Sequence, residues 1–141
     1  MTFKHLSNII KKLKEKPDNI IADPNLKETE RARELLEQLR AEYTNAYKRR
    51  KENWFRQHPD QQFFSPALEE ARRDTELQEW VWYFIERVYG MTNEQRYYAA
   101  LELGDTEEEA QKEKNKTVLD ILNDYRDYPE FDKVLKVWTE Q

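Results

Sequence analysis

The sequence contains no cysteine, only two glycines and only five prolines. Without cysteine the chain has no disulfide bonds, no thiolate nucleophile and no cysteine-bound zinc. Its turn-forming residues are too few for a sandwich or barrel of many short strands. No stretch approaches the run of about 20 apolar residues that a membrane span requires. These absences predict an all-α protein that does not cross a membrane.

The first sixteen residues also lack the features of a secretory signal peptide. They contain no uninterrupted apolar segment and no cleavage site of small residues. A chain without cysteine is also typical of a reducing compartment. We therefore expect a cytoplasmic protein.

Charged residues make up 38% of the chain, and hydrophobic residues also make up 38%. Four Trp, eight Tyr and six Phe supply much of the apolar surface, far more than a disordered segment carries. With 141 residues the chain is long enough for one hydrophobic core and too short for two ordinary domains. The composition predicts one folded domain over residues 1–141.

Apolar residues recur at helical spacing, and each Pro or Gly stands where a helix begins or ends. The segment from Trp80 to Ile85 is apolar nearly all the way round, which is typical of a helix packed on several sides. We predict a single-domain bundle of about six helices, with a long second helix and an aromatic-rich central third helix. The helices are expected at residues 2–16, 26–57, 66–90, 92–103, 105–128 and from Pro129 onward.

The second of these helices is unusually long. At 1.5 Å per residue it spans about 48 Å, whereas a compact globule of this size has a diameter of about 37 Å. Either the helix bends near Thr44 and Asn45, or its last turns, residues 47–57, project from the body of the protein as a basic arm.

Charge is divided unevenly along the chain. Residues 1–58 contain 14 Lys and Arg against nine Asp and Glu, whereas residues 59–141 contain 10 against 20, so the net charge is +5 in the first part and −10 in the second. Surfaces of opposite sign attract different partners, or pair reciprocally between two copies of a chain. The alternative is that the two parts fold against each other and their charges largely cancel.

The end of the second helix combines clustered cations with aromatic residues. Clustered cations attract phosphates, and aromatic rings can stack on exposed bases. The alternative is a helix end whose cations lie in solvent, with Tyr47 and Trp54 facing the core. The candidate binding residues of this stretch are Tyr47, Lys48, Arg49, Arg50, Lys51, Trp54 and Arg56.

Two further segments are candidates for contact with a partner. Phe63 and Phe64 lie in a polar connector, where they either anchor a partner or fold back over the bundle. Residues 105–117 form an acidic, non-amphipathic helix start that includes Glu107, Glu108 and Glu109. We expect it to be either an anionic face for a basic protein or simply a solvated helix.

Little in the sequence points to catalysis. It has no glycine-rich phosphate loop, no nucleophile elbow and no histidine pair at metal-binding spacing. The pattern Glu-x-x-Glu occurs twice, in the pairs Glu34–Glu37 and Glu76–Glu79. Carboxylates on facing helices can hold Mg²⁺ and activate water for phosphate hydrolysis, but isolated acidic pairs usually lie in solvent.

We therefore expect a non-catalytic helical protein-interaction module, such as an adaptor, an inhibitor or a small subunit of an assembly, with no cofactor and no metal. It would bind another protein, or a second copy of itself, through segregated charged faces and aromatic anchors. The second hypothesis is a subunit that binds RNA or single-stranded DNA through residues 47–56. The third is a magnesium-dependent phosphohydrolase that uses the carboxylate pairs. We expect no membrane partner.

Overall fold

The structure is a computed structural model that describes residues 4–15, 23–61 and 66–140. This part of the chain contains seven helices and no strand, so the predicted all-α class is confirmed, with its long second and aromatic-rich third helix. The helices are α1 (Lys4–Glu15), α2 (Leu26–Gln57), α3 (Pro66–Val88), α4 (Asn93–Glu102), α5 (Glu107–Lys114), α6 (Val118–Asn123) and α7 (Phe131–Glu140).

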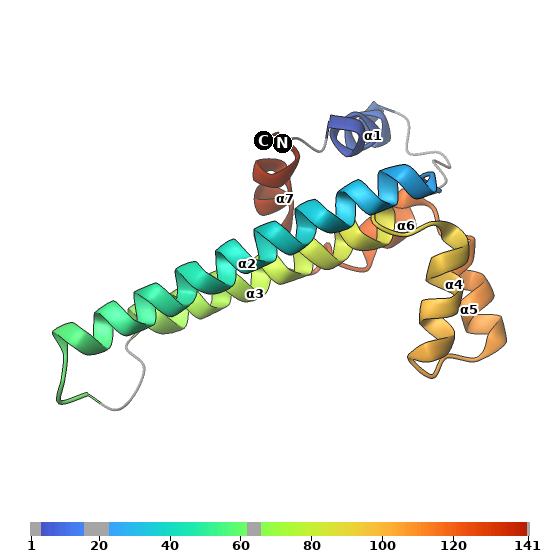
Figure 1. The fold of residues 1–141 in the computed structure, drawn as a ribbon. Coiled ribbons are helices and arrows are strands. Elements are labelled where there is room, and N and C mark those ends of the chain that lie inside the picture. Colours follow the sequence, from blue (N-terminus) through green and yellow to red (C-terminus); the bar gives the residue numbers. More distant parts are fainter. Residues whose placement is uncertain (1–3, 16–22, 62–65, 141) are drawn as a thin grey trace.

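α2 and α3 lie antiparallel and form a long helical hairpin, which reaches well beyond the other helices (Figure 1). α2 runs unbroken from its N-cap Asn25, whose side chain accepts a hydrogen bond from the backbone N–H of Glu28 at 2.9 Å. We call residues 26–40 with 77–88 the hairpin base, and residues 44–57 with 66–76 the hairpin tip. The helix therefore projects rather than bends, and the first half of α3 accompanies it.

The hydrophobic core lies at the hairpin base, where α1, α6 and α7 cover the two long helices (Figure 1). Phe84 is fully buried and meets the rings of Tyr125 and Phe131 edge-on, while those two rings stack at 5.6 Å. The aromatic residues of α3 thus form the centre of the core. The buried residues of this core are Leu6, Leu13, Ala32, Leu36, Val81, Phe84, Ile85, Val88, Val118, Ile121, Leu122, Tyr125, Phe131, Leu135 and Trp138.

α4 and α5 pack chiefly on each other, and their buried alanines, Ala100 and Ala110, do not belong to the main core. The turn between the two helices uses Gly104 at φ 98°, a conformation that suits glycine. Arg33 of α2 ties the start of this pair to the base, since its Nε donates to the carbonyl of Gly90 at 2.8 Å. The α4–α5 pair is therefore held to the body largely by polar contacts.

The single helix expected over residues 105–128 is wrong, because the structure has two helices there. Asn115 ends α5, with its backbone N–H bonded to the carbonyls of Gln111 and Lys112. Thr117 then caps α6 through a reciprocal pair of bonds with Asp120. A new N-cap so soon after the end of one helix starts a second one, which gives seven helices rather than six.

Two helix ends also differ from the prediction. α1 fills all the described residues of the predicted range 2–16, whereas α3 ends at Val88 rather than Gly90. Gly90 does not adopt the left-handed backbone of a helix C-cap; a Cβ there would lie 3.2 Å from backbone atoms of Glu86. The last helix begins at Phe131 rather than Pro129, because Glu130 takes a left-handed conformation with φ 67°.

Candidate functional site

The basic stretch predicted at the end of α2 lies at the hairpin tip. Lys48, Arg49, Arg50 and Arg56 are exposed, and within the described chain none of them forms an ion pair. Lys51, beside them, is half-buried. These four exposed cations of the tip are therefore not compensated at close range by any described residue.

The aromatic residues of this stretch are arranged differently from its cations. Tyr47 and Trp54 are half-buried, and Trp54 stacks on His58 at 4.5 Å between ring centroids. The backbone N–H of His58 also donates to the carbonyl of Trp54 and closes the helix. Cations point to solvent while the rings fold against the chain, so the two residue types do not share one open face. Phe63 and Phe64 lie outside the described residues.

The start of α3 places acidic side chains beside these cations. Residues 47–57 carry five Lys or Arg against one Glu, whereas residues 66–76 carry two Arg against four acidic residues. Of the latter, Arg72 pairs with Glu69 and Glu76 within its own helix. The charges of the two helices thus offset each other only in part, and the exposed side of α2 stays basic.

The acidic helix start lies on α5, at the opposite end of the hairpin from the tip (Figure 1). Glu107, Glu108 and Glu109 are all exposed, and Glu109 completes a capping box with Thr106. About 48 Å of helix separates the two ends. The basic and acidic surfaces therefore do not meet within one chain.

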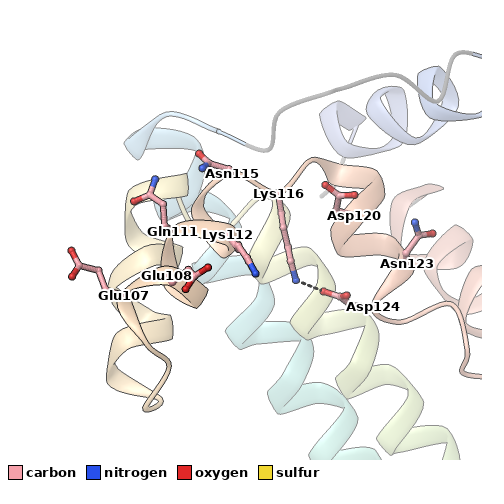
Figure 2. A pocket seen from close by; sticks show the side chains of 9 residues that line it. All are labelled: Glu107, Glu108, Gln111, Lys112, Asn115, Lys116, Asp120, Asn123 and Asp124. Carbon is pink, nitrogen blue, oxygen red and sulfur yellow. Dashed lines mark hydrogen bonds and ion pairs between the residues drawn. The ribbon is translucent and has the colours of Figure 1, made fainter.

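A broad hollow of about 860 Å³ lies between α5 and α6, and Figure 2 shows its polar lining. Lys116 points at Asp124 and pairs with it at 2.9 Å, while Glu107 points away from the hollow. The lining mixes two lysines with four acidic residues and three amides. In the described parts of the chain, no three Asp, Glu or His residues lie close enough together to hold a metal ion.

The carboxylate pairs of the third hypothesis lie on the two hairpin helices. Glu34 and Glu37 are exposed on α2. On α3, Glu76 is exposed and bound to Arg72, and Glu79 is half-buried. No metal-binding group forms around them among the described residues, so the structure adds nothing in favour of phosphate hydrolysis.

Sequence analysis missed an ion-pair network that holds the α4–α5 pair to the body. Arg87 of α3 forms two hydrogen bonds with the carboxylate of Glu113, at 3.0 and 2.9 Å, and also pairs with Asp124 at 3.0 Å. Its third partner is the hydroxyl of Tyr125 at 3.1 Å, and Lys116 joins both carboxylates. No sequence pattern signals this network, because its members are 26 to 38 residues apart from Arg87.

The protonation of this network follows from its burial and its partners. Burial alone lowers the pKa of Arg87, but the bonds to Tyr125 and Glu113 outweigh burial and raise the pKa above its ordinary value. Burial raises the pKa of Asp124, whereas Lys116 and Arg87 lower it by more, and the net result is a lowered pKa. Both groups are therefore charged at neutral pH, and the network acts as an electrostatic clamp.

No protein-family model, no curated protein and no solved structure matches the chain. None of the helices in the described ranges is long and apolar enough to cross a membrane. The described residues form a basic surface at one end of the hairpin, an acidic surface at the other, and a set of exposed aromatic side chains at the hairpin base.

Proposed function

We propose that the chain is a non-catalytic protein-interaction module that presents two surfaces of opposite charge at the two ends of a helical hairpin. The observation that carries the proposal is the separation of Lys48, Arg49 and Arg50 from the acidic start of α5, with the length of α2 between them. Charges that do not compensate each other within the chain remain available to steer oppositely charged partners.

Exposed aromatic and aliphatic side chains support the same proposal. Trp80 and Tyr83 of α3 are 36% and 38% exposed, and Trp80 stacks on Tyr128, which is 37% exposed, at 4.7 Å. Such side chains at the centre of an interface carry most of its binding energy. These residues lie at the acidic end of the molecule, so we expect this end to form the tighter contact, with a partner that carries basic residues around an apolar centre.

The test is an affinity capture from the native cell with the wild-type chain and two double variants, analysed by mass spectrometry. Arg49→Ala with Arg50→Ala removes basic charge from the tip, and Glu107→Ala with Glu108→Ala removes acidic charge from α5. We expect each double variant to lose a different set of captured proteins, and high salt to weaken both sets. Lys27→Ala with Arg31→Ala, exposed cations near the start of α2, is the matched control.

The result that would refute the proposal is capture of the same proteins by the wild-type chain and both double variants, or of none at any ionic strength. Nucleic acid that co-purifies and is removed by salt would instead favour the RNA or single-stranded DNA hypothesis. A second copy of the chain is itself a candidate partner, because its acidic end complements the basic tip. Sedimentation velocity at low and high salt detects that self-association.

A further inference from the structure

Arg96 of α4 is a buried cation without a carboxylate partner. The residue is 2% exposed, and no described residue forms an ion pair with it. One terminal nitrogen, Nη1, donates to the carbonyl of Arg87 at 3.0 Å, and the remaining contacts, to the carbonyls of Met91 and Lys114, are long at 3.5 Å. Its Nε is buried and has no acceptor. Burying a guanidinium in this way is costly unless a counter-ion is present.

The neighbouring network does not supply that counter-ion. Arg87 and Lys116 already pair with Glu113 and Asp124, two cations with two carboxylates. Burial and the repulsion of Arg87 lower the pKa of Arg96 by more than the attraction of Glu113 and Asp23 raises it. The network therefore leaves no carboxylate to pair with the positive charge of Arg96 at the junction between α3 and the α4–α5 pair.

This charge borders a cavity of about 450 Å³ at the same junction. That volume lies within the range of small-molecule sites, which are mostly apolar and hold a few polar groups. Apolar side chains from α3, α4 and the flanking turns form most of the wall: Tyr83, Met91, Ala99, Ala100, Leu103 and Tyr125. Leu103, at 86% exposed, and Tyr83, at 38%, leave the cavity open to solvent.

We propose that this cavity binds a small organic monocarboxylate with an apolar body. The carboxylate supplies the missing counter-ion of Arg96, and the apolar body lies against Ala99, Leu103 and Tyr83. A charge-assisted hydrogen bond in a partly desolvated site is worth more than one in water. The site shares no residue with the basic tip, whereas Asp105 and Glu113 belong to the acidic segment 105–117 and Tyr83 to the exposed aromatic residues of the hairpin base.

The acidic groups that line the cavity set its preference for a single negative charge. Glu113 forms ion pairs with Arg87 and Lys116. Glu86 and Asp105 have no positively charged partner within ion-pair distance among the described residues. A second carboxylate on the ligand would meet these two groups and be repelled. A monocarboxylate is therefore expected to bind better than a dicarboxylate of the same length.

The test uses four eight-carbon probes and records backbone amide shifts of the full chain by NMR. The probes are octanoate, octanol, octylammonium and octanedioate. We expect octanoate to shift the amides of Ala99, Ala100 and Leu103 saturably, and to bind about tenfold more tightly than the other three probes. Arg96→Met removes the charge and keeps most of the volume, so it should abolish that preference. Arg73→Met, an exposed cation at the hairpin tip, is the matched control.

A second variant keeps the test decisive if Arg96→Met does not fold. Ala99→Met fills the cavity and leaves Arg96 in place, so octanoate binding should be lost with the fold intact. For the wild type, the proposal is overturned if octanoate binds no more tightly than octanol, or if the amide shifts map to another surface. For the variants, it is overturned if folded Arg96→Met keeps the preference for octanoate, or if Ala99→Met binds octanoate as well as the wild type does. Loss of partner capture on Arg49→Ala with Arg50→Ala does not depend on any of these outcomes, because the cavity shares no residue with the tip.

Discussion

The two ends of the α2–α3 hairpin consist of the same two helices and are stabilised in different ways. At the hairpin base, α1, α6 and α7 add further layers, and all three buried residues of α2, Thr29, Ala32 and Leu36, lie there. At the hairpin tip, the described parts of α2 and α3 pack mainly on each other, and Leu68 and Ala71 are the buried residues among those described. Burial against several elements makes the base the stable part, and pairwise packing makes the tip the part that opens first.

The tip also differs from the body in the kind of surface that its described residues expose. None of the described residues of the tip is a large hydrophobic side chain in the exposed class, whereas Trp80, Tyr98, Leu103 and Val137 are exposed in or near the body. The described surface of the tip therefore presents mainly charge. Under the proposed function, we expect the tip to make electrostatic contacts and the body to make apolar ones.

The largest expected effect comes from removing the same side chain at each end. Leu36→Ala at the base, where the side chain is 1% exposed, should lower the free energy of unfolding by about 3–5 kcal/mol. Leu68→Ala at the tip, where the side chain is 3% exposed, should cost only about 2 kcal/mol, because two helices can close a cavity more easily than a layered core can. Urea denaturation followed by circular dichroism measures both values. Equal losses would show that the tip is part of the same rigid core.

Most of the fold could be predicted from the sequence because helix punctuation and apolar spacing are local signals. Residues 26–57 were expected as one helix and are one helix. The break after Asn115 also had a local signal, since Thr117 and Asp120 have the spacing of a capping box. The apolar face that starts at Val118 is a competing signal, because its helical spacing is also compatible with a continuation of the preceding helix.

The candidate sites likewise include features that have a local sequence signal and features that depend on tertiary packing. The basic and acidic surfaces are runs of like charge and could be predicted, although their placement at opposite ends depends on the path of α3. The pairing of Arg87 with Glu113 and the burial of Arg96 could not be predicted, because both depend on how the α4–α5 pair packs against α3. A chain with 38% charged residues offers too many possible ion pairs for spacing alone to select one.

A smaller effect should distinguish a half-buried charge at the base from an exposed one at the tip. Burial raises the pKa of Glu86 by more than Arg33 and Arg40 lower it, so the folded protein holds the proton more tightly than the unfolded chain does. Stability from this group is therefore present at low pH and is lost as the pH rises through the raised pKa. Glu86→Gln should be more stable than the wild type at neutral pH, and the difference should disappear below about pH 4.

The matched control for this comparison is Glu70→Gln, an exposed acidic residue at the tip. It should leave the urea midpoint unchanged across the same pH range. If Glu86→Gln were no more stable than the wild type at neutral pH, the attraction of Arg33 and Arg40 would outweigh burial, and the base would tolerate its buried charge as easily as the tip tolerates its exposed one.

The smallest effect is expected from the cations that motivate the proposed function. Arg49→Ala with Arg50→Ala should change the free energy of unfolding by no more than about 0.5 kcal/mol, because both side chains are exposed and neither forms an ion pair with a described residue. Urea denaturation of the double variant measures this free energy directly. A loss well above that range would mean that these cations stabilise the hairpin, for instance against the acidic start of α3. An unchanged stability combined with lost partner capture would mean that the tip holds its cations for binding rather than for folding.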